Sequence, residues 1–210
     1  MNRVGQNQVI SIVLITGIII SLVTAAYLWG APLIEKRSTV TDVEIAKTFM
    51  RSLNDKIIDV ANAGTGSVTM EIPNGYIKVS PYDGSDEDNN SVELQLVTGQ
   101  QMVFPDTTVF LGSTAEEIGI YGEAEPNILT LEGEGRNRRE YSIFIKNRYR
   151  ELDTNDTVVP RGFQIAVNDG QSVISGTSSL SISFDKIETI SAAAGNGGDL
   201  ILTHITVVPV

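Results

Sequence analysis

Residues 9–34 read VISIVLITGIIISLVTAAYLWGAPLI, and this stretch decides the architecture of the chain. None of these residues is charged. About 20 such residues are enough to cross a bilayer as a helix. Tyr27 and Trp29 stand near the end of the run, where aromatic anchors at a membrane interface are expected. We therefore predict a membrane-type helix over 9–34, preceded by a short polar segment over 1–8.

A secretory signal peptide is the alternative for this segment. The apolar core of a signal peptide is typically about 7–15 residues long. The run over 9–34 is longer, and only Arg3 precedes it as a basic residue. Val23-Thr24-Ala25 resembles a weak cleavage site. The length of the run favours a helix that stays with the mature protein.

Small and hydroxyl side chains interrupt the apolar run. Hydroxyl groups are tolerated in such a helix because they can bond back to its own carbonyls or across to a neighbouring helix. Gly17, Ser21 and Ala25 lie at four-residue steps and would let the backbones of packed helices approach closely. The alternative is that this face of the helix meets only lipid.

A second helical pattern covers 38–63. Thr41 and Glu44 have the spacing of a capping box, which predicts a helix start, and Gly64 predicts its end. Pro32 lies between the two patterns and, with the glycine two residues before it, predicts a kink there. The sequence thus favours two helical pieces in series.

One stripe of apolar side chains runs along the second helix in alternating steps of three and four residues. Its members are Val43, Ala46, Met50, Leu53, Ile57 and Val60. Such a stripe can pack on a sheet, on helices of other copies, or on both. The plainest alternative is burial within the chain's own domain.

Residues 65–210 are expected to form an all-β domain, an immunoglobulin-like sandwich, so that the fold class is α+β. Short alternating runs separated by Gly, Pro, Asn and Asp predict strands at 68–72, 76–79, 92–97, 107–111, 128–131, 141–149, 163–167, 180–184 and 200–208. Pro73-Asn74-Gly75 predicts a hairpin turn between the first two strands. Nine strands over this length suit one sandwich.

Charge and composition exclude several classes of protein. The 210 residues include 15 basic and 26 acidic side chains, for a net charge of −11, and no cysteine. Residues 65–210 alone carry −12, which opposes general binding to nucleic acid. Disulfide frameworks, zinc-cysteine sites and thiol nucleophiles are excluded, and the lone His204 cannot form a histidine metal cluster. We expect no cofactor and no catalytic residue.

Three sets of polar residues are candidate sites. The loop with Asp83, Ser85, Asp86 and Asp88 offers oxygens to calcium but lacks the spacing of a helix-loop-helix calcium site, so a solvated loop is favoured. Glu132 and Glu134 have no partner that would tune their pKa values for catalysis and are expected to be surface carboxylates. A tethered hydrolase that uses them is the weakest alternative. His204 is expected to be structural.

A basic cluster and two sequons complete the candidate surface features. The cluster consists of Arg136, Arg138, Arg139, Lys146, Arg148 and Arg150. It could dock against the acidic face of another copy, or it could be an ordinary intramolecular or solvated cluster. Asn89 and Asn155 begin sequons for N-glycosylation in predicted loops, which suits an exported protein.

The order of these parts resembles the type IV pilin-like proteins of archaea, which include relatives of archaeal flagellins. Arg3-Val4-Gly5-Gln6 is similar to a prepilin peptidase site that is cleaved after Gly5 to free Gln6. The run over 9–28, rich in Ile and Val with interspersed Gly and Thr, also resembles that family, as does the passage from helix to strand over 64–75. Ile10 stands at the fifth mature position, where many pilins carry Glu.

The resemblance implies a structural subunit of a surface filament, with apolar helices bundled in its core, β-sandwich heads outside, and a role in adhesion or attachment. The implied partners are other copies of the chain, the membrane before assembly, a prepilin peptidase and the assembly machinery. The alternative is a monomeric, single-pass membrane protein that displays an exported β-sandwich as a binding module. Only the first requires removal of a leader.

Overall fold

The computed structural model describes residues 3–84, 89–99, 101–105, 107–112, 116–135, 140–169, 173–175 and 179–210. The chain divides into two compact units, Met1–Thr41 and Asp42–Val210. One helix contributes to both units, and all described strands belong to the second. The coarse prediction, a long apolar N-terminal helix followed by β-structure, is therefore confirmed.

Helix α1 (Arg3–Ala63) is 61 residues long and continues without a break through Pro32. It does not begin again at Thr41, so the capping-box prediction is wrong. Because the preceding residues are already helical, the Thr41 hydroxyl donates to the Arg37 carbonyl at 3.0 Å, as serine and threonine commonly do inside helices. The two predicted helical pieces are thus parts of one helix.

The end of α1 follows the prediction. Gly64 has a φ of 63°, a left-handed conformation that glycine adopts without steric cost. Its N–H donates to the Val60 carbonyl at 3.2 Å, which satisfies one of the carbonyls left free at a helix end. The chain leaves the helix here and enters the sheets.

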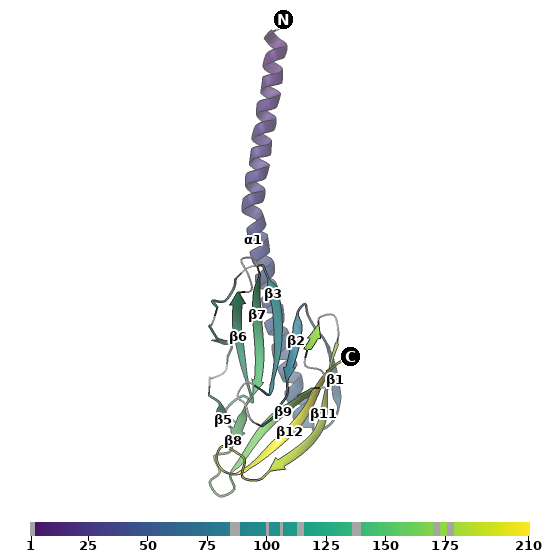
Figure 1. Ribbon diagram of the computed structural model, residues 1–210, viewed down its shortest axis with the longest axis vertical. Coiled ribbons are helices and arrows are strands. Elements are labelled where there is room, and N and C mark those ends of the chain that lie inside the picture. Colours follow the sequence, from purple (N-terminus) through teal and green to yellow (C-terminus); the bar gives the residue numbers. More distant parts are fainter. Residues whose placement is uncertain are drawn as a thin grey trace. The chain divides into compact units, whose positions relative to one another are not determined.

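The twelve strands in the described part of the chain form two six-stranded sheets. The first is antiparallel throughout, in the order β10 (Val173–Ser175), β2 (Tyr76–Ser80), β3 (Ser91–Thr98), β7 (Tyr141–Tyr149), β6 (Asn127–Gly135) and β4 (Val109–Phe110). The second has the order β1 (Ser67–Glu71), β11 (Ser179–Ile190), β12 (Asp199–Pro209), β9 (Arg161–Asp169), β8 (Glu151–Asp153) and β5 (Ile118–Ile120). Figure 1 shows β7 between β3 and β6, and β12 between β9 and β11.

The second sheet is mixed, because β12 pairs with β9 and β5 pairs with β8 in parallel. Its remaining pairs are antiparallel. An immunoglobulin fold is built from antiparallel sheets, so only the coarser description, α+β with two sheets, is established.

The hairpin predicted at residues 73–75 is wrong. Strand β1 pairs with β11, whereas β2 pairs with β3, so this turn carries the chain from one sheet to the other. Gly75 has a φ of 142°, and a Cβ built on it would lie 2.7 Å from the carbonyl oxygen of Gln95. The glycine is needed for this close backbone approach rather than for a two-residue hairpin.

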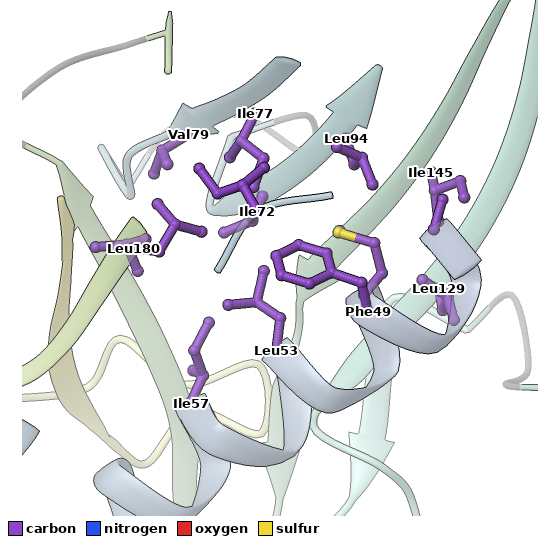
Figure 2. Packing of buried hydrophobic residues seen from close by; sticks show 14 of the residues in the cluster. Phe49, Leu53, Ile57, Ile72, Ile77, Val79, Leu94, Leu129, Ile145 and Leu180 are labelled. Atoms are coloured by element: carbon purple, nitrogen blue, oxygen red, sulfur yellow. The ribbon is translucent and has the colours of Figure 1, made fainter. Parts of the chain in front are cut away.

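The second half of α1 shares one core with both sheets (Figure 2). The six stripe residues are each at most 4% exposed: Val43, Ala46, Met50, Leu53, Ile57 and Val60. Figure 2 shows Phe49, Leu53 and Ile57 lying toward Ile72, which follows β1, and toward Leu180 of β11. The stripe is therefore buried within its own domain, and the alternative that it packs on helices of other copies is wrong.

Two buried asparagines hold these layers together. Asn147 of β7 donates to the Met50 carbonyl of α1 at 2.8 Å. Asn90 donates to the carbonyls of Tyr149 at 3.0 Å and Ile165 at 2.7 Å, and its Oδ1 accepts from the Val167 amide at 2.8 Å. Since Tyr149 belongs to β7 and the other two residues to β9, Asn90 joins the two sheets.

Candidate functional site: the exposed apolar segment of α1

The first half of α1 carries the largest exposed apolar surface that the structure describes. From Ser11 onward the helix contains an 18-residue window of mean hydropathy 2.3, none of it buried, which is long and apolar enough to cross a membrane. Leu14 is 60% exposed and Ile20 likewise 60%. Contiguous apolar surface of this size marks a membrane or protein interaction site.

Two hydroxyl groups in this segment are satisfied within the helix. Thr16 donates to the Ile12 carbonyl at 2.8 Å, and Ser21 donates to the Gly17 carbonyl at 2.8 Å. This confirms the expectation that such groups bond back to their own helix. The two side chains consequently present no unpaired donor to an apolar neighbour.

The stripe of small residues forms the floor of a shallow groove along this segment. Gly17, Ser21 and Ala25 line it, with walls that include Leu14 and Leu22. A Cβ built on Gly17 would meet nothing within 4 Å. No contact within the described chain therefore requires glycine at position 17. The groove is open to any molecule that covers the helix.

Helix α1 begins at Arg3, six residues before the start that the sequence predicts at Val9. Gly5 and Gln6 belong to the first turns of α1. Tyr27 is 73% exposed and Trp29 80% exposed, near the charged residues that follow the apolar run. This arrangement suits an interfacial anchor.

The second unit places Glu132 at its surface. Its Oε1 accepts from the Thr108 hydroxyl at 2.9 Å, and Glu134 lines the same shallow depression. Both carboxylates are exposed, as the sequence predicts for surface residues.

His204 is 8% exposed in β12. Its Nδ1 lies 3.2 Å from the Asn168 side-chain amide. Its Nε2 lies 3.2 Å from Glu188 Oε2, a charge contact whose geometry does not make a hydrogen bond. Glu188 also accepts from Lys186 at 2.7 Å. A histidine held between an amide and an ion pair has the surroundings of a structural residue.

The basic cluster is only partly within the described residues, because Arg136, Arg138 and Arg139 fall outside them. Arg148 donates to Glu117 at 2.6 Å. Arg150 is 4% exposed, and its guanidinium donates to the carbonyls at 125 (2.9 Å) and 116 (2.7 Å). These two arginines bind the segment 116–125 of their own chain, as the intramolecular alternative expects, and docking of the cluster on another copy stays a prediction.

The acidic loop also lies mainly outside the described residues, which include Asp83 but not Ser85, Asp86 or Asp88. Asp83 Oδ2 accepts from the Asn89 amide at 2.7 Å. Within the described part of the chain, no three His, Cys, Asp or Glu side chains gather to hold a metal. The calcium alternative for this loop stays untested.

The two sequons differ in accessibility. The Asn89 amide is engaged by Asp83, and Ser91, the hydroxyl residue of that sequon, is 1% exposed. By contrast, Asn155 and Thr157 are both exposed in the loop between β8 and β9. Only the second sequon is open to a transferase in the folded chain.

Sequence analysis missed a polar pocket of about 330 Å³. Tyr82, Arg148, Glu151 and Gln164 help to line it. Burial raises the pKa of the Glu151 carboxyl to about 7, against the opposing effect of the Gly195 N–H, which donates to it at 2.7 Å. The neighbouring Asp153 raises the pKa further. The only signal in the sequence was the alternation in Glu151-Leu152-Asp153, which puts both carboxyls on one face of a strand.

Comparison of the chain with protein-family models, with curated proteins and with solved structures finds no match in any of the three.

Proposed function

We propose that this chain is the structural subunit of an archaeal type IV pilus-like surface filament. The observation that carries the proposal is a contrast within α1. The stripe from Val43 to Val60 is buried against the sheets of the second unit, which is called the head below, whereas the apolar surface from Ser11 to Ile34 is left uncovered. A uniformly apolar helix attached to a folded acidic head suits storage in a membrane followed by bundling with other copies.

Bundling of apolar helices that leave a membrane requires that their surfaces fit closely together. Lipid tails are as apolar as leucine, so transfer of a helix from membrane to bundle gains little from the hydrophobic effect and depends on close packing. The groove floored by Gly17, Ser21 and Ala25 supports this proposal, because small residues let neighbouring helix backbones come close.

The remaining parts of the proposal come from the sequence resemblance. Cleavage after Gly5 by a prepilin peptidase would free Gln6, and assembly machinery would move the subunit from the membrane into a filament at the cell surface. The function is mechanical and adhesive, without catalysis, cofactor or nucleic acid. An immunoglobulin-like head belongs to this proposal: the antiparallel sheet fits it, and the two parallel strand pairs depart from it.

The first experiment is intact mass and N-terminal peptide mapping of the protein from native membranes and from sheared surface material. A mature start at Gln6 in sheared, high-molecular-weight material is the expected result. An uncleaved start confined to membranes would overturn the filament proposal and favour the anchored binding module. A start near Ala26 would identify a secreted protein and overturn both.

A further inference from the structure

A polar cavity of about 230 Å³ lies beside the buried part of α1, where the helix faces the adjoining strands β6 and β7. Its polar lining is Arg51, Asn54, Asp55, Glu125, Asn127 and Asn147. All these residues belong to the second unit. Because no residue of the exposed apolar segment lines the cavity, occupancy of the cavity does not require filament assembly.

Two amide oxygens in this cavity are buried without a partner. Asn127 is 4% exposed; its Nδ2 donates to Asn147 Oδ1 at 3.0 Å, and its own Oδ1 has no partner. Asn54 is 9% exposed, and its Oδ1 is likewise unpartnered. Buried carbonyl oxygens are nearly always satisfied in folded proteins, so an occupant that supplies donors or positive charge is expected here.

No described side chain donates to either oxygen, although the Arg51 guanidinium also lines the cavity. The Asn147 amide is already used, since it donates to the Met50 carbonyl at 2.8 Å. Tyr149 pairs with Asn127 across the β6–β7 ladder, is 1% exposed, and its hydroxyl is also without a partner. Burial, and to a smaller extent the Asp55 carboxylate, raise the pKa of this phenol. A third buried oxygen thus lies close to the same region.

The charge of the lining favours a cation. Asp55 and Glu125 bring two carboxylates to the cavity, against one guanidinium from Arg51. An oxygen-only set of carboxylates and amide carbonyls is the donor set of Ca²⁺, which accepts 6–8 oxygens in flexible geometry, whereas Mg²⁺ demands a near-ideal octahedron. We infer that this cavity binds Ca²⁺ through Asn54, Asn127 and the carboxylates of Asp55 and Glu125.

The described residues contain no group of three or more His, Cys, Asp or Glu side chains that could hold a metal, and this site has only two carboxylates. With two carboxylates and two neutral amides, the expected dissociation constant is that of weak extracellular calcium sites, about 10⁻⁴ to 10⁻³ M. Binding would fasten the helix to the β6–β7 pair, because the ligands come from both sides of the cavity.

The test uses the full chain in detergent micelles. Thermal unfolding followed by circular dichroism and calorimetric titration are run with CaCl₂, with MgCl₂ at equal concentration as the reference ion. We expect Ca²⁺ to raise Tm saturably and Mg²⁺ to do so far less. Asp55→Asn should weaken Ca²⁺ binding about tenfold. Asp59→Asn, an exposed position one turn further along the same helix and outside the cavity, should bind as the unchanged protein does.

A second variant tests the same inference in the opposite direction, by strengthening Ca²⁺ binding. Asn54→Asp adds a carboxylate to the cavity and should tighten Ca²⁺ binding, even if it lowers Tm in the absence of the ion. Equal responses to Ca²⁺ and Mg²⁺, equal Ca²⁺ affinity in Asp55→Asn and Asp59→Asn, or no tightening in Asn54→Asp would each overturn the inference. A cavity filled only by water gives the first of these results.

Discussion

Helix α1 contains two apolar regions, a run over 9–34 without a charged residue and a stripe over 43–60 with charged residues between its members, and their environments differ completely. Leu14 in the first region is 60% exposed, whereas Leu53 in the second is 0% exposed and packs against both sheets. The difference teaches that apolar content alone does not say what covers a helix. The second region is covered by its own chain, and the first must be covered by lipid or by other molecules.

The largest effect is expected from a charge in the buried region. Leu53→Asp places an unpaired carboxylate at a fully buried site and should destabilise the head by about 4–5 kcal/mol, a large part of the stability of a typical domain. Thermal unfolding by circular dichroism measures it. The matched control is Ile45→Asp, at a position of the same helix that is 51% exposed.

The same variant distinguishes burial of the stripe within its own domain from packing of the stripe on other copies. If the stripe packed on other copies, Leu53→Asp would leave the head folded and abolish filaments only. A head with unchanged Tm in Leu53→Asp would contradict the burial described here and restore that interpretation.

The next effect concerns the exposed region. Ala25→Leu fills the groove and should cost about 1–3 kcal/mol per helix contact by overpacking, enough to abolish filaments while leaving the Tm of the head unchanged. Electron microscopy of sheared material provides the readout. Ala26→Leu, the same change at the neighbouring position outside the groove, is the control. Equal filament yields in the two variants would show that this face meets only lipid.

A smaller effect is expected from pH. Because the pKa of Glu151 is raised from 4.5 to about 7 in the folded chain, the folded state binds this proton more tightly than the unfolded state does. Stability contributed by the group is present below pH 4.5 and is lost as the pH rises to about 7. Glu151→Gln should flatten this part of the stability profile measured by chemical denaturation at several pH values.

The control for the pH prediction is Glu123→Gln, an exposed carboxylate in the segment before β6. It should leave the slope of stability against pH between 4.5 and 7 as it is in the unchanged protein. A flat profile in the unchanged protein would mean that Glu151 is ordinarily ionised in the folded chain.

The smallest effect on the molecule is a modification. In native material we expect a glycan on Asn155 and none on Asn89, because only the first sequon is exposed on both its acceptor and its hydroxyl residue. Glycopeptide mass spectrometry checks both positions, with Asn155→Gln as the control for assignment. A glycan on Asn89 would imply that modification precedes folding.

Much of the fold was predictable from local patterns. The strand over 141–149 alternates strongly, and its predicted bounds coincide with those of β7. Gly64 ends the helix as expected, since a helix end is encoded locally. The sequence does not predict β5, β8 and β10, because alternation over only three residues cannot be told from chance.

The errors concern relations between distant segments. The turn at 73–75 has hairpin residues, but nothing local shows that β1 finds its partner at β11, more than a hundred residues later. The stripe of α1 has the same periodicity whether it meets a sheet or another helix. Likewise, the raised pKa of Glu151 depends on burial and on Gly195, which only the fold brings beside it.

The attachment of α1 to the head has a mechanical consequence. The helix is bound to β7 through Asn147 and Met50, it continues through Gly64 into β1 of the other sheet, and Asn90 couples β7 to β9. Tension applied along the helix is therefore divided between the two sheets instead of peeling away one edge strand. Pulling the helix out of a head built in this way would require many contacts to break at the same time, and the head therefore resists it.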